Sequence, residues 1–176
     1  FGAREDVSLQ IHLCLLALAT GRPVKMVYDR KESFVGHVHR HPARMSYRHE
    51  ATPDGDLVMV GARMVFDGGA YASTSSAVLV NAITLAQGPY RCPNAVVDGW
   101  AVRTNHLPCG AMRGFGAVQA CFAYETQMDK LADAITGNPN LVANGLRADF
   151  GYVGDVGALP PNLDALASNP GGYATW

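Results

Sequence analysis

Hydrophobic and polar positions divide the chain into helix-like and strand-like stretches. Residues 8–20 are apolar almost all the way round a helix, which predicts a buried helix that stops at Gly21. From residue 117 onward, apolar side chains recur at every third or fourth position, as on one face of an amphipathic helix. This apolar stripe consists of Val118, Cys121, Tyr124, Met128, Leu131 and Ile135.

Strand-like patterns occupy much of the sequence between these two helices. Residues 45–63 hold two strand-like runs around a turn signal at residues 52–56, where Pro and Gly stand as in tight turns, and this predicts a hairpin. Residues 24–28 and 95–104 are typical of further strands, and the Ser- and Ala-rich residues 71–85 fit either a helix or irregular structure. The mixture of elements predicts an α+β fold.

The character of the chain changes after Ile135. Glycine, proline and asparagine become frequent, and neither a helical nor a strand period is sustained. We therefore expect residues 136–176 to form a loop-rich, weakly ordered tail, separate from an ordered unit over residues 1–135.

Composition limits the classes of protein to consider. With 176 residues, 48% of them hydrophobic, the chain can bury a real core in one ordinary domain. Fourteen Lys and Arg against fifteen Asp and Glu give a net charge of −1, which argues against nucleic acid and anionic membrane surfaces as partners. The four scattered cysteines form no zinc or redox motif, and no apolar run approaches the roughly 20 residues of a membrane span. A reducing cytoplasm is the expected location.

Two glycine-bearing segments are candidates for binding chemistry. Residues 113–116 read Arg-Gly-Phe-Gly and place two glycines around one cation and one aromatic ring, just before the helix that starts near residue 117. Such backbone can approach a flat anionic group closely, although the same pattern also occurs in plain turns into helices. Residues 1–6 read Phe-Gly-Ala-Arg-Glu-Asp and likewise run directly into a helix.

These segments together resemble the molybdenum-binding subunit of xanthine dehydrogenases and aldehyde oxidases, and the first eight residues look most like the bacterial purine hydroxylase branch. The resemblance covers about residues 1–134 and rests on the order and spacing of residues 1–5, 20–29, 40–42 and 111–116. It implies that residues 1–135 are part of a molybdopterin-binding domain, with helices packed on a mixed β-sheet. The tail departs from the family pattern, either by divergence or through a frame error or gene fragment.

The resemblance implies a cofactor site made largely of backbone groups. Phe1, Gly2, Arg113 and Gly114 match segments that contact the cofactor, and Phe1 and Arg113 match contacts to the molybdenum centre itself. The cofactor is expected to be molybdenum-molybdopterin, in the cytosine dinucleotide form if the protein is bacterial. Fixed backbone donors suit an oxygen-rich anionic centre because they are in place before charge develops.

Two side chains are expected to bind substrate. Glu5 matches the glutamate that faces the purine, and Phe115 matches an aromatic wall of the substrate slot. Without the resemblance, Glu5 is an ordinary acidic residue in a first helical turn and Phe115 an ordinary core residue. Asn81 stands where animal xanthine dehydrogenases carry a purine-orienting arginine, which weakens xanthine as the substrate, and Arg91 is a possible substitute.

The resemblance also identifies groups that cannot be placed in this chain. An upstream glutamine at the metal, further loops around the pterin and a downstream glutamate that acts as general base are not found here, so the chain alone is expected to be inactive. Electrons are expected to leave through 2Fe-2S clusters and FAD on partner domains or subunits of an oligomer, since no cluster motif or dinucleotide fingerprint occurs.

The expected reaction is hydroxylation of a purine, such as xanthine or hypoxanthine, or of a related N-heterocycle, with water as the oxygen source. Alternative substrates in the same family are an aldehyde, a nicotinate-like ring or an aromatic thioester. An alternative of another class is a noncatalytic fragment or a metal-binding module. In that module His37, His39 and His41 would share one face of a strand. His12 and His106 are expected to be structural, although His106 is close enough in sequence to the glycine loop to line the pocket.

Overall fold

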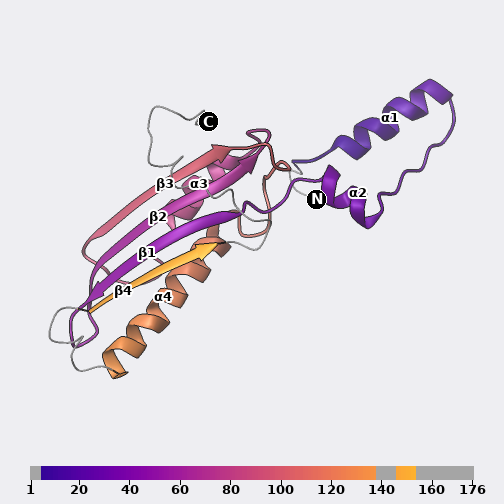
Figure 1. Cartoon of the computed structure of the whole chain (residues 1–176). Coiled ribbons are helices and arrows are strands. Elements are labelled where there is room, and N and C mark those ends of the chain that lie inside the picture. The colour runs from indigo at the N-terminus through magenta and orange to yellow at the C-terminus, as the bar shows by residue number, and fades with distance from the viewer. Residues whose placement is uncertain (1–4, 138–145, 154–176) are drawn as a thin grey trace.

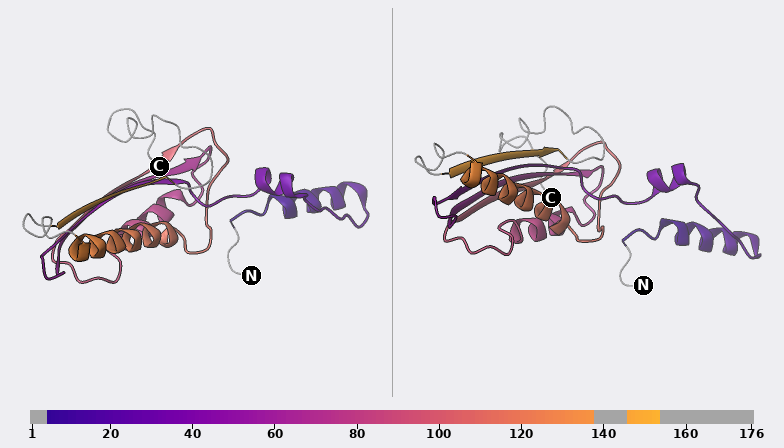
Figure 2. Two further views of the ribbon diagram at one scale, coloured as in Figure 1. Left: turned by 60° about the horizontal axis from the view of Figure 1, so that its bottom comes forward. Right: turned by 90° about the horizontal axis from the view of Figure 1, so that it is seen from below.

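The computed structural model describes residues 5–137 and 146–153. A four-stranded sheet with strand order β3-β2-β1-β4 forms the body of the molecule. Helices α3 (Ser75–Thr84) and α4 (Ala117–Gly137) lie side by side on one face of this sheet, as Figures 1 and 2 show. The sheet contains both antiparallel and parallel pairs, so the expected α+β fold with helices on a mixed sheet is confirmed.

The predicted hairpin is confirmed. Strands β1 (Ala43–Ala51) and β2 (Leu57–Gly69) pair antiparallel around the turn at residues 52–56. Gly55 has a φ of 95°, a conformation that favours glycine, and its N–H donates to the Thr52 carbonyl at 3.0 Å. The predicted strand at residues 95–104 is also present as β3 (Ala95–Arg103), which lies parallel to β2 after a crossover through α3.

The tail that was predicted to be loop-rich contains one strand that was not predicted. Strand β4 (Leu146–Val153) pairs antiparallel with β1 along its open edge. Its sequence alternates between apolar positions and polar or glycine positions over residues 146–152, a strand pattern that the prediction overlooked. The strand pairs with the otherwise unpaired backbone of β1. Residues 138–145 and 154–176 lie outside the described residues, and the domain boundary near residue 135 stays a prediction.

The core lies between the sheet and the two helices. Large side chains from β1 and β2, including Met45, Tyr47, Met64 and Phe66, pack under small residues of the helices. The buried positions of α4 are Gln119, Ala120, Ala123, Gln127 and Leu131.

The buried face of α4 differs from the apolar stripe predicted for it. Leu131 is buried, but Val118 and Cys121 are exposed. The alanines face the sheet because their small side chains let the helix axis approach the large residues of the strands. Val118 and Cys121 instead border an apolar hollow of about 690 Å³ with Leu85 and Tyr124.

Helices α1 (Ser8–Thr20) and α2 (Arg30–Gly36) form an arm that extends beyond one end of the sheet (Figures 1 and 2). The expected end of the first helix is confirmed, since Gly21 has a φ of 60° and its N–H bonds the Ala17 carbonyl at 2.9 Å. The expected burial of this helix is wrong in the described structure, because none of its residues is buried and Leu18 is 81% exposed. Its all-round apolar surface needs cover that the described residues do not supply.

The segment after α1 also differs from the prediction. Residues 24–28 are irregular rather than a strand. Helix α2, which was not predicted, begins at a capping box in which Asp29 Oδ1 accepts the Glu32 N–H at 2.7 Å and Glu32 Oε2 accepts the Asp29 N–H at 2.8 Å. The Asp-x-x-Glu spacing was visible in the sequence and is the signal that could have found this helix. Among the described residues, every helix is too short or too polar to cross a membrane.

Candidate cofactor and substrate site

The glycine loop, residues 110–116, leads directly into α4. Three successive residues in it have a positive φ: 86° at Gly114, 47° at Phe115 and 91° at Gly116. The loop is closed by hydrogen bonds from the Phe115 N–H to the Met112 carbonyl at 2.7 Å and from the Ala117 N–H to the Gly114 carbonyl at 2.8 Å. Phe115 is one of two non-glycine residues with positive φ in the described structure, so surrounding contacts must stabilise it.

Gly116 is fixed by the close approach of α3. It is buried, and a Cβ at this position would meet the Val78 carbonyl oxygen and lie 3.1 Å from Ala82 Cβ. A larger residue would therefore push the loop off the helix.

Two side chains from distant elements hold the loop carbonyls. Arg40, just before β1, donates from Nη2 to the Arg113 carbonyl at 2.7 Å. Asn81, on α3, donates from Nδ2 to the Phe115 carbonyl at 2.7 Å. Neither contact was anticipated from the sequence, in which residues 40–42 were only part of the family resemblance and Asn81 stood at the position of a purine-orienting arginine.

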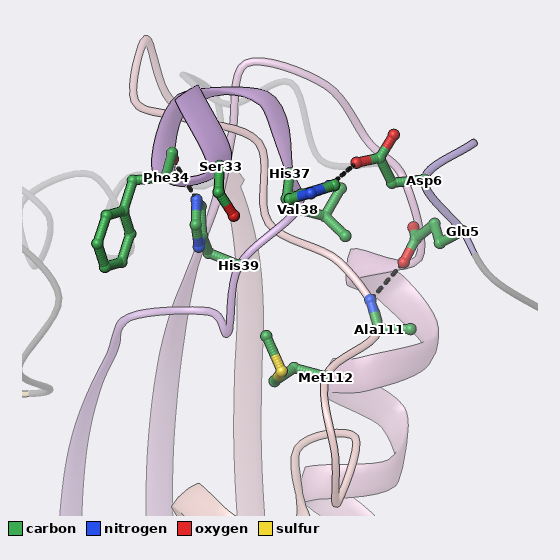
Figure 3. A pocket seen from close by; sticks show the side chains of 9 residues that line it. All are labelled: Glu5, Asp6, Ser33, Phe34, His37, Val38, His39, Ala111 and Met112. Carbon is green, nitrogen blue, oxygen red and sulfur yellow. Dashed lines mark hydrogen bonds and ion pairs between the residues drawn. The ribbon is translucent and has the colours of Figure 1, made fainter. Parts of the chain in front are cut away.

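Glu5 brings the N-terminal segment to the same loop. Its carboxylate accepts the backbone N–H of Ala111, as Figure 3 shows. It also accepts the hydroxyl of Thr74 at 3.1 Å. Gly110 makes room for this contact, since a Cβ there would meet the Glu5 carboxylate. The two glycine-bearing segments that the sequence singled out therefore meet in space through Glu5 and Ala111.

A cavity of about 430 Å³ opens beside Glu5. Figure 3 shows its walls, which come from the N-terminal segment, the end of α2 and the glycine loop. Its lining residues are Glu5, Asp6, Ser33, Phe34, His37, Val38, His39, Ala111 and Met112.

The other predicted site residues lie elsewhere. Arg113 and Gly114 are exposed in the loop, and Phe115 is half-buried against the core under α3 and α4, so neither Arg113 nor Phe115 lines this cavity. Phe1 and Gly2 lie outside the described residues. The roles of these five residues, and of Glu5, in binding cofactor or substrate stay predictions.

Asp6 and His37 form an ion pair at the rim of the cavity, with Oδ2 and Nδ1 2.5 Å apart (Figure 3). Burial acts to raise the pKa of Asp6, but hydrogen bonds from Ser8 and His37 outweigh burial and lower the pKa below its ordinary value of 3.8. Ser8 contributes both its hydroxyl, at 2.7 Å, and its backbone N–H, at 3.1 Å. The pair fastens the start of α1 to the chain that leaves α2.

The proposed histidine metal site is not supported by the geometry. Residues 37–41 are not a strand, and their imidazoles have separate partners: Asp6 for His37, the Phe34 carbonyl for His39 and the Ser75 hydroxyl, at 2.8 Å, for His41. Within residues 5–137 and 146–153, no group of three His, Cys, Asp or Glu residues is placed to hold a metal ion. Burial lowers the pKa of His41 to about 4, against the opposing effect of the Glu5 and Asp67 carboxylates.

A buried carboxylate anchors the chain that leads into the glycine loop. Asp67, at the end of β2, is fully buried and accepts from the Thr104 hydroxyl at 2.6 Å and from the Gly69 N–H at 2.9 Å. Its second oxygen lies 2.5 Å from Nδ1 of His106, which is the structural role expected for that histidine. Sequence reasoning missed Asp67, although a lone acidic residue within an apolar strand is a usable signal.

The residues around the loop fit an oxygen-rich anionic group such as molybdopterin. The loop offers backbone with positive φ directly before a helix N-terminus, a combination that binds anions. Two buried polar atoms at the edges of the loop, Glu5 Oε1 and Arg40 Nη1, have no hydrogen-bond partner among the described residues. Buried polar atoms are normally satisfied, so these two are available to a bound group.

Comparison with known proteins agrees with this geometry. The chain belongs to the molybdopterin cofactor-binding domain family, whose profile matches residues 1–143. This confirms the resemblance inferred from the glycine-bearing segments, and it gives molybdopterin as the cofactor of the family.

Among similar proteins, the nicotinate dehydrogenase large molybdopterin subunit of Eubacterium barkeri is 45% identical over 79% of this chain and 33% of the relative. A probable xanthine dehydrogenase subunit of Bacillus subtilis (strain 168) is 40% identical over 79% of this chain and 19% of the relative. The chain thus spans between about a fifth and a third of the length of these curated relatives.

Solved structures show the same arrangement. The aldehyde oxidoreductase from Desulfovibrio gigas matches 87% of this chain and 18% of its own, with a TM-score of 0.62 and 31% identity. The quinoline 2-oxidoreductase from Pseudomonas putida 86 matches 76% of this chain and 17% of its own, with a TM-score of 0.64 and 32% identity. The names of these relatives cover several substrates, so family membership does not select one.

Proposed function

We propose that this chain is part of a molybdenum hydroxylase that oxidises a purine or a related N-heterocycle and uses water as the oxygen source. The observation that carries the proposal is the position of Glu5, whose carboxylate is fastened to the glycine loop at Ala111 while one of its oxygens lacks a partner among the described residues. A carboxylate held in this way can accept a hydrogen bond from a ring N–H and help carry charge that is delocalised onto the heterocycle.

The chain's own residues would orient cofactor and substrate. The backbone N–H groups of Arg113, Gly114 and Gly116 would hold the cofactor, together with Arg40 and with Phe1 and Gly2 of the N-terminal segment. When bound, the molybdenum centre supplies the two-electron oxidation that accompanies transfer of a water-derived oxygen to the ring carbon. Glu5 would orient the heterocycle, and the general base would come from a part of the protein outside this chain.

The wider assembly follows from the same proposal. Electrons would pass to 2Fe-2S clusters and FAD on partner domains or subunits, and the cofactor would be the cytosine dinucleotide form in a bacterial protein. A reducing cytoplasmic location is compatible with the four cysteines, all of which are free thiols.

A nicotinate-like ring is the second candidate substrate. The 45% identity to the nicotinate dehydrogenase subunit favours it. The cavity argues the other way, because Glu5 and Asp6 both line it and would repel a carboxylate on the ring. Aldehydes and aromatic thioesters are weaker candidates, since neither offers a ring N–H to Glu5.

The test is Glu5→Gln in the holoenzyme that carries this chain, with a panel of a purine, nicotinate, an aldehyde and an aromatic thioester. We expect purine turnover to fall by one to a few orders of magnitude, where each factor of ten is about 1.4 kcal/mol of transition-state stabilisation, while molybdenum content stays nearly normal. Glu125→Gln is the control, because Glu125 is exposed on α4 and accepts only from Tyr90 among the bonds described for it.

Two results would contradict the proposal. If Glu5→Gln emptied the site of molybdenum, Glu5 would be a structural residue at the start of the first helix. If purine turnover were unchanged in Glu5→Gln while aldehyde turnover persisted, the protein would be an aldehyde-type enzyme.

A further inference from the structure

Arg40 and Asn81 hold two alternate carbonyl groups of the glycine loop. Arg40 Nη2 lies 2.7 Å from the Arg113 oxygen, and Asn81 Nδ2 lies 2.7 Å from the Phe115 oxygen. Arg40 comes from the segment before β1 and Asn81 from α3, so the loop is fixed from two elements that do not belong to it.

Because the peptide bond is planar, these two contacts also fix the directions of the N–H groups of Gly114 and Gly116. In a trans peptide the C=O of one residue and the N–H of the next point in opposite directions, and no cis peptide occurs in the described chain. A carbonyl held at residue 113 therefore turns the Gly114 N–H away from Arg40. In the same way, the carbonyl held at residue 115 turns the Gly116 N–H away from Asn81.

The backbone conformation of the loop depends on the same contacts. Phe115 has a φ of 47°, which is unfavourable for a side chain of its size, and lies between two glycines that also have positive φ. Successive N–H groups in such a turn can form a concave binding site for an anion. The Asn81 bond at the Phe115 carbonyl stabilises this strained conformation.

We propose that Arg40 and Asn81 are positioning residues, which fix the Gly114 and Gly116 N–H groups in the direction needed to bind the anionic molybdopterin centre. This inference rests on the proposed function. It assigns Asn81 to the loop and not to the substrate, so this position does not supply a substitute for the purine-orienting arginine.

The experiment compares five variants of the holoenzyme by hydrogen–deuterium exchange and by molybdenum content. Asn81→Asp keeps the shape of the side chain but removes the donor, and Arg40→Gln shortens the side chain and removes its charge. Thr84→Val is the control for Asn81, because Thr84 lies one turn further along α3, is exposed and bonds only its own helix at the Val80 carbonyl. Arg63→Gln is the control for Arg40, since Arg63 is exposed on β2 with its guanidinium over the Trp100 ring.

In Asn81→Asp and Arg40→Gln, we expect peptides that cover residues 111–117 to exchange about two- to tenfold faster than in the wild type. We expect these two variants to bind the cofactor with roughly tenfold lower affinity than the wild type. They should therefore lose molybdenum on dialysis. Exchange over residues 57–69 of β2 should stay unchanged and so report an intact fold, and Arg40→Lys should recover part of the loss. Both control variants should behave like the wild type.

Unchanged exchange at residues 111–117 would overturn the inference, and so would faster exchange with normal molybdenum retention. If the hydrogen exchange of β2 also became faster in Asn81→Asp, that variant would report a general loss of folding. The comparison of Arg40→Gln with Arg40→Lys would then decide whether the side-chain bonds fix the loop. If the wild-type protein contained no molybdopterin, the proposed function would be overturned. The hydrogen-exchange measurements would still show whether Arg40 and Asn81 fix the loop.

Discussion

The Glu5 carboxylate accepts the backbone N–H of Ala111, a residue 106 positions later in the sequence. This contact joins the N-terminal segment to the loop that precedes α4. Because Glu5 is followed directly by the Asp6–His37 ion pair, two neighbouring acidic residues fasten one segment at two points. The first contact depends on a backbone donor, and the second depends on the Asp6 carboxylate and the His37 ring.

Asp6→Asn should loosen the arm while Glu5 stays in place. The lowered pKa of Asp6 means that its contribution to stability is present above the ordinary value of 3.8 and is lost as the pH falls through the lower folded value. We therefore expect wild-type protein at pH 7 to resist proteolysis after Lys25 more than Asp6→Asn does. At strongly acid pH, hydrogen exchange in residues 7–36 should become equal in the two proteins. Equal proteolysis at pH 7 would show that the ion pair does not hold the arm.

Two buried histidines should make the fold sensitive to mild acid. Burial lowers the pKa of both His41 and His49 to about 4, from an ordinary value of 6.5. Between these values the unfolded chain binds more protons than the folded chain, so stability falls as the pH decreases from about 6.5 to about 4, by at most of the order of 3 kcal/mol per histidine. Urea unfolding midpoints measured from pH 7.5 to pH 4.5 would show this slope.

His49→Phe isolates one of these two groups. Both ring nitrogens of His49 are buried without a hydrogen-bond partner among the described residues, so phenylalanine should be neutral or stabilising at pH 7. The slope of unfolding free energy against pH should decrease in this variant by the equivalent of up to one bound proton. In His12→Phe, on the exposed face of α1, the slope should stay as in the wild type. An unchanged slope in His49→Phe would mean that His49 is not neutral in the folded state at pH 5 to 6.

Gly116→Ala should destabilise the protein strongly. Gly116 has a φ of 91°, and an added Cβ would meet the Val78 carbonyl oxygen, so strain and overlap together should cost about 2–4 kcal/mol. Gly21→Ala is the matched control, because its φ of 60° is also positive but nothing lies within 4 Å of an added Cβ. That control should cost only about 1 kcal/mol by thermal or urea unfolding. Equal costs for the two variants would show that contact with α3 is unimportant.

The sequence was most informative where local chemistry decides the structure. The turn between β1 and β2 was predicted because Pro53 and Gly55 suit a tight turn, and Gly21 ended α1 as expected. The span of α4 was predicted by its period, but its buried face was not. Periodicity identifies apolar positions such as Val118, whereas the distance between helix and sheet favours Ala120 and Ala123.

The candidate site was only partly predictable for a similar reason. The motif residues identified the two segments that meet at Glu5 and Ala111. The bonds from Arg40 to the Arg113 carbonyl and from Asn81 to the Phe115 carbonyl span 73 and 34 residues, and such contacts leave no periodic pattern in a sequence. Strand β4 was missed although residues 146–152 alternate between apolar and polar or glycine positions, because so short an alternation among many glycines and prolines is a weak signal unless the edge of β1 is known.

Asp67→Asn should weaken the chain that delivers the glycine loop. The Asp67 side chain is 1% exposed, and its two oxygens face the Thr104 hydroxyl, the Gly69 N–H and the His106 ring. An asparagine keeps one acceptor but turns an NH₂ toward groups that donate, so at least one buried donor loses its partner, at a cost of about 1–3 kcal/mol.

Asp98→Asn is the matched control, because Asp98 is exposed on β3 and an exposed substitution of this kind changes stability by less than about 0.5 kcal/mol. In urea unfolding at pH 7, the free energies of unfolding of the two variants should differ by more than the experimental error. Because the Cys109 N–H bonds the Gly68 carbonyl beside Asp67, the same variant should also speed hydrogen exchange in residues 104–110. If Asp67→Asn were as stable as Asp98→Asn, the Asp67 carboxylate would be dispensable for holding this segment, and the loop would depend on Arg40, Asn81 and Glu5 alone.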